Sequence, residues 1–183
     1  MNFNKHYNLV GEHAILSASK YSWLNKNDEE LANWYATEKA AERGTRLHAI
    51  AAELISEGIR VQGTKTTFAR YVNDAIGFKM TPEQVLYYSP YCFGTADAIC
   101  YNEKDHVLLI HDLKTGNTPA HMEQLIVYSA LFYLEYHIKP ESNKTILRLY
   151  QNGNITEYIP DYMEIEKVMD TIIKNDNYIK MFK

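Results

Sequence analysis

The stretch VLLIHDLKTG, residues 107–116, runs four apolar residues directly into charged ones. Such a branched run bounded by polar residues is typical of an interior strand that is covered on both faces. Because side chains alternate along a strand, Asp112 and Lys114 project from one face, and His111 and Leu113 from the other. An acid and a base at a strand end form either a weak surface ion pair or part of a polar site. The neighbouring segments must decide between the two.

Two further strands are predicted before this stretch, over residues 84–89 and 91–102. Both segments have period-two or continuous apolar patterns. The polar loop NEKDH then suits a hairpin, which makes strand 91–102 an antiparallel neighbour of strand 107–114. In that pairing Asp97 comes beside Asp112 and Lys114 on a shared face.

Helical patterns precede the strands. Ser17 or Ser19 could cap a short helix that carries Trp23. Residues 27–58 are helical by periodicity, with an interruption at Gly44-Thr45 and a stop at Gly58. A shorter helix is expected over residues 68–78.

After Gly116 the pattern returns to helical spacing. Thr118 is a good N-cap and Pro119 fits the first helical position. A hairpin around Asn152-Gly153 and an amphipathic helix over residues 163–182 complete the chain. The order of elements predicts an α/β (α+β) fold with a mixed sheet, in a single domain over residues 1–183.

The composition limits the class of protein. The chain has 183 residues, of which 46% are hydrophobic, and its net charge of −4 argues against a nonspecific nucleic-acid coat protein. A local basic groove remains compatible with that charge. The two cysteines, Cys92 and Cys100, fit core positions in a reducing compartment. No signal peptide or membrane-spanning run is found, so we expect a cytoplasmic protein.

Two convergent carboxylates need a reason, because like charges a few ångströms apart repel unless a cation neutralises them. An oxygen-rich site of this kind suits Mg²⁺ or Mn²⁺. A helical His48 follows Gly44, and Gln124 and Tyr128 lie four residues apart on one helix face. Each of these three residues alone is more often structural than functional.

Taken in order, four patterns carry a resemblance: Gly44-Thr45-x-x-His48, Gly94-x-x-Asp97, Asp112-x-Lys114 and Gln124-x-x-x-Tyr128. This series resembles the RecB-type branch of the PD-(D/E)XK nucleases, which includes nuclease domains of bacterial recombination helicases, CRISPR-associated adaptation nucleases and phage exonucleases. The resemblance extends from about Gly44 to Tyr128. The phrases HAILSASKYSWLN and LRLYQNGNI also look like a phage-encoded subgroup of that family.

The resemblance implies a restriction-endonuclease-like mixed central sheet flanked by helices. It implies that His48, Asp97, Asp112 and the main-chain carbonyl of Leu113 hold the metal. Lys114 would be the catalytic lysine, and two further residues would position it or the DNA backbone, namely Gln124 and Tyr128.

The chain departs from the pattern in three respects. Ala96 replaces the proline of the family name, and the second motif acid is Asp112 rather than glutamate. Two cysteines exclude the four-cysteine iron–sulfur cluster of some members. No GxxxxGK[ST] loop occurs, so ATP cannot power translocation within this chain.

Basic residues near the first motif could hold phosphates along a bound strand, or could form a solvated face. They are Arg43, Arg46, Lys65 and Arg70.

The leading hypothesis is a Mg²⁺- or Mn²⁺-dependent DNA nuclease. We expect an exonuclease that processes DNA ends in phage or bacterial recombination or replication, in the host cytoplasm and alongside a phage recombination partner protein. The alternatives are a structure-selective endonuclease, a non-cleaving DNA- or protein-binding module on a nuclease fold, and a hydrolase of small phosphoesters. The sequence leaves the oligomeric state open.

Overall fold

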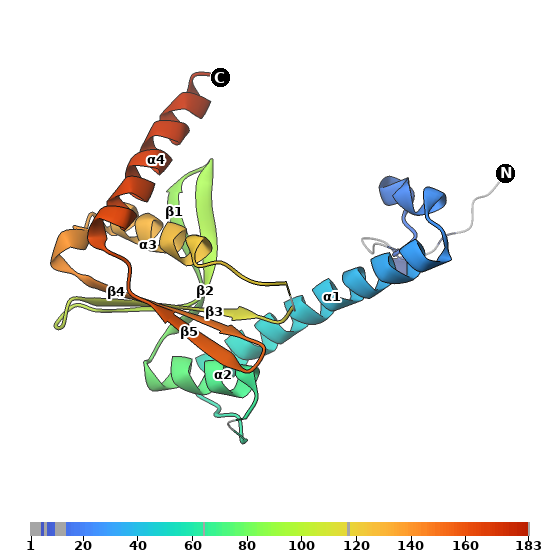
Figure 1. Ribbon diagram of the computed structural model, residues 1–183, viewed down its shortest axis with the longest axis horizontal. Coiled ribbons are helices and arrows are strands. Elements are labelled where there is room, and N and C mark those ends of the chain that lie inside the picture. The colour runs from blue at the N-terminus through green and yellow to red at the C-terminus, as the bar shows by residue number, and fades with distance from the viewer. Residues whose placement is uncertain (1–4, 6, 10–13, 64, 117, 183) are drawn as a thin grey trace. The chain divides into compact units, whose positions relative to one another are not determined.

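A computed structural model describes residues 5, 7–9, 14–63, 65–116 and 118–182 (Figure 1). The chain divides into two compact units, residues 1–43 and 44–183, and each is considered by itself. The expectation of a single domain stays a prediction. The elements, in chain order, are the 3-10 helices η1 (Tyr7–Leu9) and η2 (Ala18–Asn25), then α1 (Asp28–Ser56), α2 (Thr67–Gly77), β1 (Thr81–Ser89), β2 (Cys92–Asn102), β3 (Val107–Lys114), α3 (Glu123–Tyr136), η3 (Pro140–Ser142), β4 (Lys144–Gln151), β5 (Asn154–Tyr158) and α4 (Tyr162–Lys180).

The five strands form one mixed sheet in the order β1-β2-β3-β4-β5. The β3–β4 pair is parallel, and the other neighbours are antiparallel. The predicted pairing of β2 with β3 is confirmed, with Asn102 opposite Val107. With helices flanking the sheet, the predicted α/β (α+β) class is confirmed as well.

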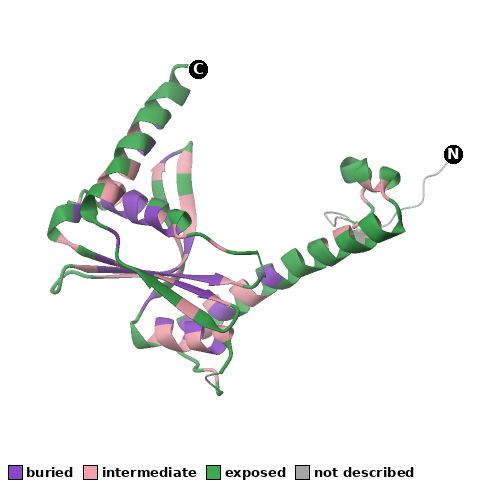
Figure 2. Cartoon of the chain, in the orientation of Figure 1, coloured by how far each residue is buried: buried purple, intermediate pink, exposed green. Residues whose placement is uncertain are grey.

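Alternation along β3 builds a separate core on each face of the sheet. Leu108 and Ile110 pack into the cluster that α3 covers, and α4 packs against α3. Leu109 and Leu113 pack into the cluster formed with α2 and the C-terminal part of α1. Figure 2 shows the consequence, because β3 is buried along most of its length. A strand covered on both faces is what the continuous apolar run predicts.

The expected interruption at Gly44-Thr45 is wrong, because α1 continues from Asp28 to Ser56. Gly44 is buried, and a Cβ built there would lie 2.8 Å from Oγ1 of Thr115. The glycine therefore allows close approach of the segment after β3 rather than a break in the helix. The predicted stop is confirmed, since Gly58 has φ +66° and the Ile59 amide donates to the Leu54 carbonyl.

The expected start of α3 at Thr118 and Pro119 is also wrong, because the helix begins at Glu123. Gln151, at the end of β4, holds the preceding segment instead. Its Nε2 donates to the Thr118 carbonyl at 2.8 Å, and its Oε1 accepts from the Ala120 amide at 3.3 Å. Groups that would have joined the first helical turn are thus engaged by a neighbouring strand.

Other local expectations are confirmed. Ser17 caps η2 by accepting from the Ser19 amide, and the β4–β5 turn has positive φ at both Asn152 and Gly153. None of the helices in the described part of the chain combines the length and apolar character needed to cross a membrane.

His111 lies fully buried on the α2 face of β3. Its ring meets Phe78 edge-on at 5.7 Å, and its Nδ1 lies 3.3 Å from the Tyr150 hydroxyl, which donates to Asp74. Among the described residues, its Nε2 has no hydrogen-bond partner. Burial, reinforced by nearby Arg148, lowers the pKa of His111 to about 3.

Replacing His111 by Gln should flatten the acid dependence of stability. In the unfolded chain the imidazole takes up a proton below about pH 6.5, whereas in the folded chain it resists protonation to about pH 3. Stability is therefore full above pH 6.5 and falls as the pH drops towards 3, by several kcal/mol at about 1.4 kcal/mol per pKa unit. Urea unfolding at pH 7 and pH 4.5 measures this, with exposed His121→Gln as the control. Equal acid sensitivity of His111→Gln and the wild type would contradict it.

Candidate metal centre

Three side chains from three elements converge in the second unit. They are His48 of α1, Glu83 of β1 and Asp97 of β2, and their ligand atoms all lie within 4.8 Å of one another. One imidazole nitrogen and two carboxylate oxygens form a donor set that suits a divalent cation such as Mn²⁺ or Mg²⁺.

Strand pairing accounts for the position of Glu83. Pro82 pairs with Ala98 and Gln84 with Ala96, so Glu83 stands opposite Asp97 in the same register. Its φ of +48° is unusual for a glutamate, and such conformations occur at functional sites more often than elsewhere. Burial, followed by the charge of Asp97, raises the pKa of Glu83.

Asp97 connects this group to β3. Its Oδ2 accepts a hydrogen bond from the Leu113 amide at 2.8 Å and lies 3.4 Å from Nδ1 of His48. The hydrogen bond to Asp97 is the main reason that the pKa of His48 is raised above its ordinary value of 6.5. A carboxylate held from both sides is a fixed ligand rather than a mobile one.

A second set of side chains meets on the α3 face of the sheet. Lys114 Nζ lies 3.1 Å from Oδ1 and 3.0 Å from Oδ2 of Asp112, and it donates to Gln124 at 2.8 Å. Gln124 in turn donates to the Tyr128 hydroxyl at 2.8 Å. The structure therefore brings the predicted catalytic lysine, Lys114, together with Asp112, Gln124 and Tyr128.

Asp112 is buried, with 1% of its surface exposed. Burial first, and the negative charge of Asp97 second, raise the pKa of Asp112, while Lys114 lowers it. Its Oδ2 is buried and has no hydrogen bond of good geometry among the described residues, although it faces Lys114. A buried oxygen beside a second carboxylate fits the approach of a divalent cation.

The glycine in the pattern Gly94-x-x-Asp97 has a structural reason. A Cβ at this position would lie 2.9 Å from Cε1 of Tyr128, so β2 can approach the tyrosine ring only with glycine there. The spacing Gly94-x-x-Asp97 thus combines a contact with α3 and a metal ligand three residues later.

The remaining predicted residues are less closely tied to the site. Leu113 is buried, and its amide binds Asp97, while the metal-ligand role of its carbonyl stays a prediction. Arg46 and Lys65 are exposed, and Arg70 donates to the Gly153 carbonyl in the β4–β5 turn. Arg43 is exposed and belongs to the first unit.

Glu83 is the residue that sequence reasoning missed. The sequence pattern predicts this strand over residues 84–89, which leaves Glu83 one residue outside it. β1 is an edge strand, where proline is tolerated, and it begins at Thr81. Counting back from the turn pair Ser89–Cys92 would place Glu83 opposite Ala98, and the register shift between Tyr87 and Ser89 brings it opposite Asp97 instead.

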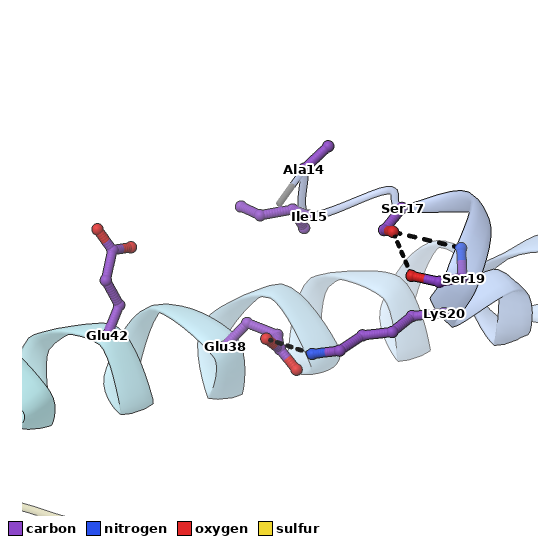
Figure 3. Close-up of a pocket in the computed structure, with 7 residues that line it drawn as sticks. All are labelled: Ala14, Ile15, Ser17, Ser19, Lys20, Glu38 and Glu42. Atoms are coloured by element: carbon purple, nitrogen blue, oxygen red, sulfur yellow. Dashed lines mark hydrogen bonds and ion pairs between the residues drawn. The ribbon is translucent and has the colours of Figure 1, made fainter. Parts of the chain in front are cut away.

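Two pockets lie away from these residues. One, of about 360 Å³ in the first unit, contains the 3.5 Å ion pair between Lys20 and Glu38 (Figure 3). The other, of about 570 Å³, lies along the C-terminal turns of α4 around Tyr178. Neither includes a residue of the candidate metal centre.

No protein-family model, curated protein or solved structure compared with this chain matches it.

Replacing Glu83 by Gln should weaken Mn²⁺ binding about 10- to 100-fold, because one charged ligand is lost while the side-chain shape is kept. Titration calorimetry measures the affinity, and Glu103→Gln in the β2–β3 turn is the matched control. Protons compete with the metal for His48, whose pKa is raised, so affinity should fall as the pH drops through and below neutrality. Unchanged Mn²⁺ affinity in a folded Glu83→Gln protein would remove Glu83 from the centre.

Proposed function

We propose that this chain is a Mg²⁺- or Mn²⁺-dependent DNA nuclease that hydrolyses phosphodiester bonds. The observation that carries the proposal is the convergence of His48, Glu83 and Asp97, together with a buried Asp112 that is outside this group and is paired with Lys114. A structural ion pair alone would not need two further carboxylates and a histidine at the same place.

His48, Glu83, Asp97 and Asp112 are the residues that would hold the metal. A bound divalent cation would supply Lewis-acid activation of water and neutralise charge on the phosphate. The chain itself supplies orientation. The Leu113 amide fixes the Asp97 carboxylate, and the imidazole of His48 lies against the same oxygen.

Lys114 acts as a fixed cation in this proposal. It is held between Asp112 and Gln124, and Tyr128 supports Gln124 from the next turn of α3. A preorganised positive charge at this place stabilises the negative charge that grows on the phosphate oxygens in the transition state. The same contacts keep the lysine from moving when substrate arrives.

DNA is proposed as the substrate on the strength of the motif order, which resembles that of RecB-type nucleases. Because the protein has a net charge of −4, its attraction for DNA depends on local cations such as Lys114 and Arg46 and not on the overall charge of the molecule. We propose processing of DNA ends in the cytoplasm of a bacterial host during phage or bacterial recombination. A phage recombination protein is the proposed partner.

Replacing Asp112 by Asn should reduce cleavage at least ~100-fold, because a charged ligand is lost and the anchor of Lys114 is weakened. The free energy of unfolding should change by no more than about 1 kcal/mol. Lys114 would keep its hydrogen bond to Gln124, and its side chain is partly exposed to solvent. Cleavage of labelled linear DNA in Mg²⁺ and in EDTA, together with urea unfolding, measures both effects. The exposed Asp170→Asn on α4 is the matched control. A folded Asp112→Asn protein with full Mg²⁺-dependent activity would eliminate the site.

Linear DNA should be degraded under conditions in which circular duplex survives, because a site that takes a terminus need not admit an intact duplex. Cleavage should also fall steeply as salt rises, since local phosphate contacts release counterions. Matched circular, linear and end-blocked linear substrates across a salt series provide the test. Equal cleavage of circular and end-blocked DNA would instead identify an endonuclease.

A further inference from the structure

An exposed aromatic pair lies on the outer face of the β1–β2 hairpin. Tyr87 and Phe93 are opposite each other in the register, and their rings stack with centroids 6.4 Å apart and planes 29° apart. Tyr87 is 46% exposed and Phe93 is 62% exposed, whereas Leu86, which precedes Tyr87 on β1, is fully buried. Large aromatic surface has therefore been left in solvent on the side of the hairpin that does not build the core.

The pair is in line with the candidate metal centre. Glu83, Val85 and Tyr87 alternate along β1, and all three are exposed. At about 3.4 Å per residue, Tyr87 lies about 14 Å along the strand from Glu83. Four stacked nucleotides at about 3.4 Å each cover the same length.

Two contacts from neighbouring helices fix the hairpin at this level. The Tyr87 amide donates to Oε2 of Glu135 in α3 at 2.8 Å. Two residues further along β1, the Ser89 hydroxyl is hydrogen-bonded to Asp176 of α4, which also pairs with Lys180. The aromatic pair thus stands on a backbone held by two helices, so little order is lost when a ligand stacks on it.

We propose that Tyr87 and Phe93 form a base-stacking platform for single-stranded DNA whose phosphate backbone leads to the metal centre. This proposal rests on the proposed nuclease function and names the form of its substrate. Aromatic faces favour nucleobases, which stack on them without regard to sequence. In a duplex the base faces are already stacked, and only an unpaired strand offers them.

The experiment compares two labelled oligonucleotides in EDTA, so that binding is measured without cleavage. One is a short oligothymidylate, and the other has the same sugar–phosphate backbone with abasic sites. Fluorescence anisotropy at fixed salt should show that the wild-type protein binds the oligothymidylate about tenfold more tightly or better. Tyr87→Ala/Phe93→Ala should bind both oligonucleotides alike, near the abasic affinity.

The matched control is Tyr178→Ala/Phe182→Ala, which removes another exposed aromatic pair, in α4 and the turn after it. This variant should keep the preference for bases. The abasic comparison on wild-type protein needs no variant, so the test holds even if the altered hairpin does not fold. Equal wild-type affinities, a preference that survives in Tyr87→Ala/Phe93→Ala, or no binding of either oligonucleotide would each overturn the platform.

Cleavage in Mg²⁺, measured on the same preparation, separates the two proposals. Cleavage without a preference for bases overturns the platform and leaves the nuclease proposal standing. A base preference that the hairpin substitutions abolish, with no cleavage in Mg²⁺ or Mn²⁺, supports the platform and overturns the nuclease.

Discussion

The hydrogen bond between the Leu113 amide and the Asp97 carboxylate holds the candidate site in place. The backbone pairing of β2 with β3 extends from Asn102 to Ala98 on β2. At the next position the Asp97 side chain accepts from the β3 amide. A buried amide without a partner would cost about 1–3 kcal/mol. The contact that extends the pairing of the two strands is therefore also the contact that orients a candidate metal ligand, and His48 and Glu83 lie around it.

The carboxylates of Asp97 and Asp112 repel each other at the candidate site. Burial and the negative charge of Asp97 both raise the pKa of Asp112, and Lys114, followed by His48, offsets them. Lys114 is held by Gln124, and Gln124 is held by Tyr128. Tyr128 in turn packs against β2 at Gly94. Preorganised charge of this kind is useful for a reaction that develops negative charge, because little reorganisation is needed when substrate binds.

The β1–β2 hairpin has a double role. Its inner face contributes Leu86 to the core under α3, while its outer face presents Val85, Tyr87 and Phe93 to solvent. Because β1 is an edge strand of the described sheet, only its β2 side is paired with another strand. The same two strands thus carry the candidate ligands Glu83 and Asp97 and the exposed aromatic pair.

Local pattern was sufficient for the mixed α/β sheet, the β2–β3 hairpin, the turn at Asn152-Gly153 and the helix stop at Gly58, because each depends on alternation or on residues with special backbone freedom. The alternation along β3 also put Asp112 and Lys114 on one face. Tertiary contacts decided the rest. Gly44 lies within α1 and lets Thr115 approach the helix closely, and Gln151 holds the segment before α3. Glu83 became a candidate ligand only through its cross-strand position opposite Asp97. Such cross-strand positions depend on which segments pair in the folded protein. Local sequence patterns do not specify that pairing.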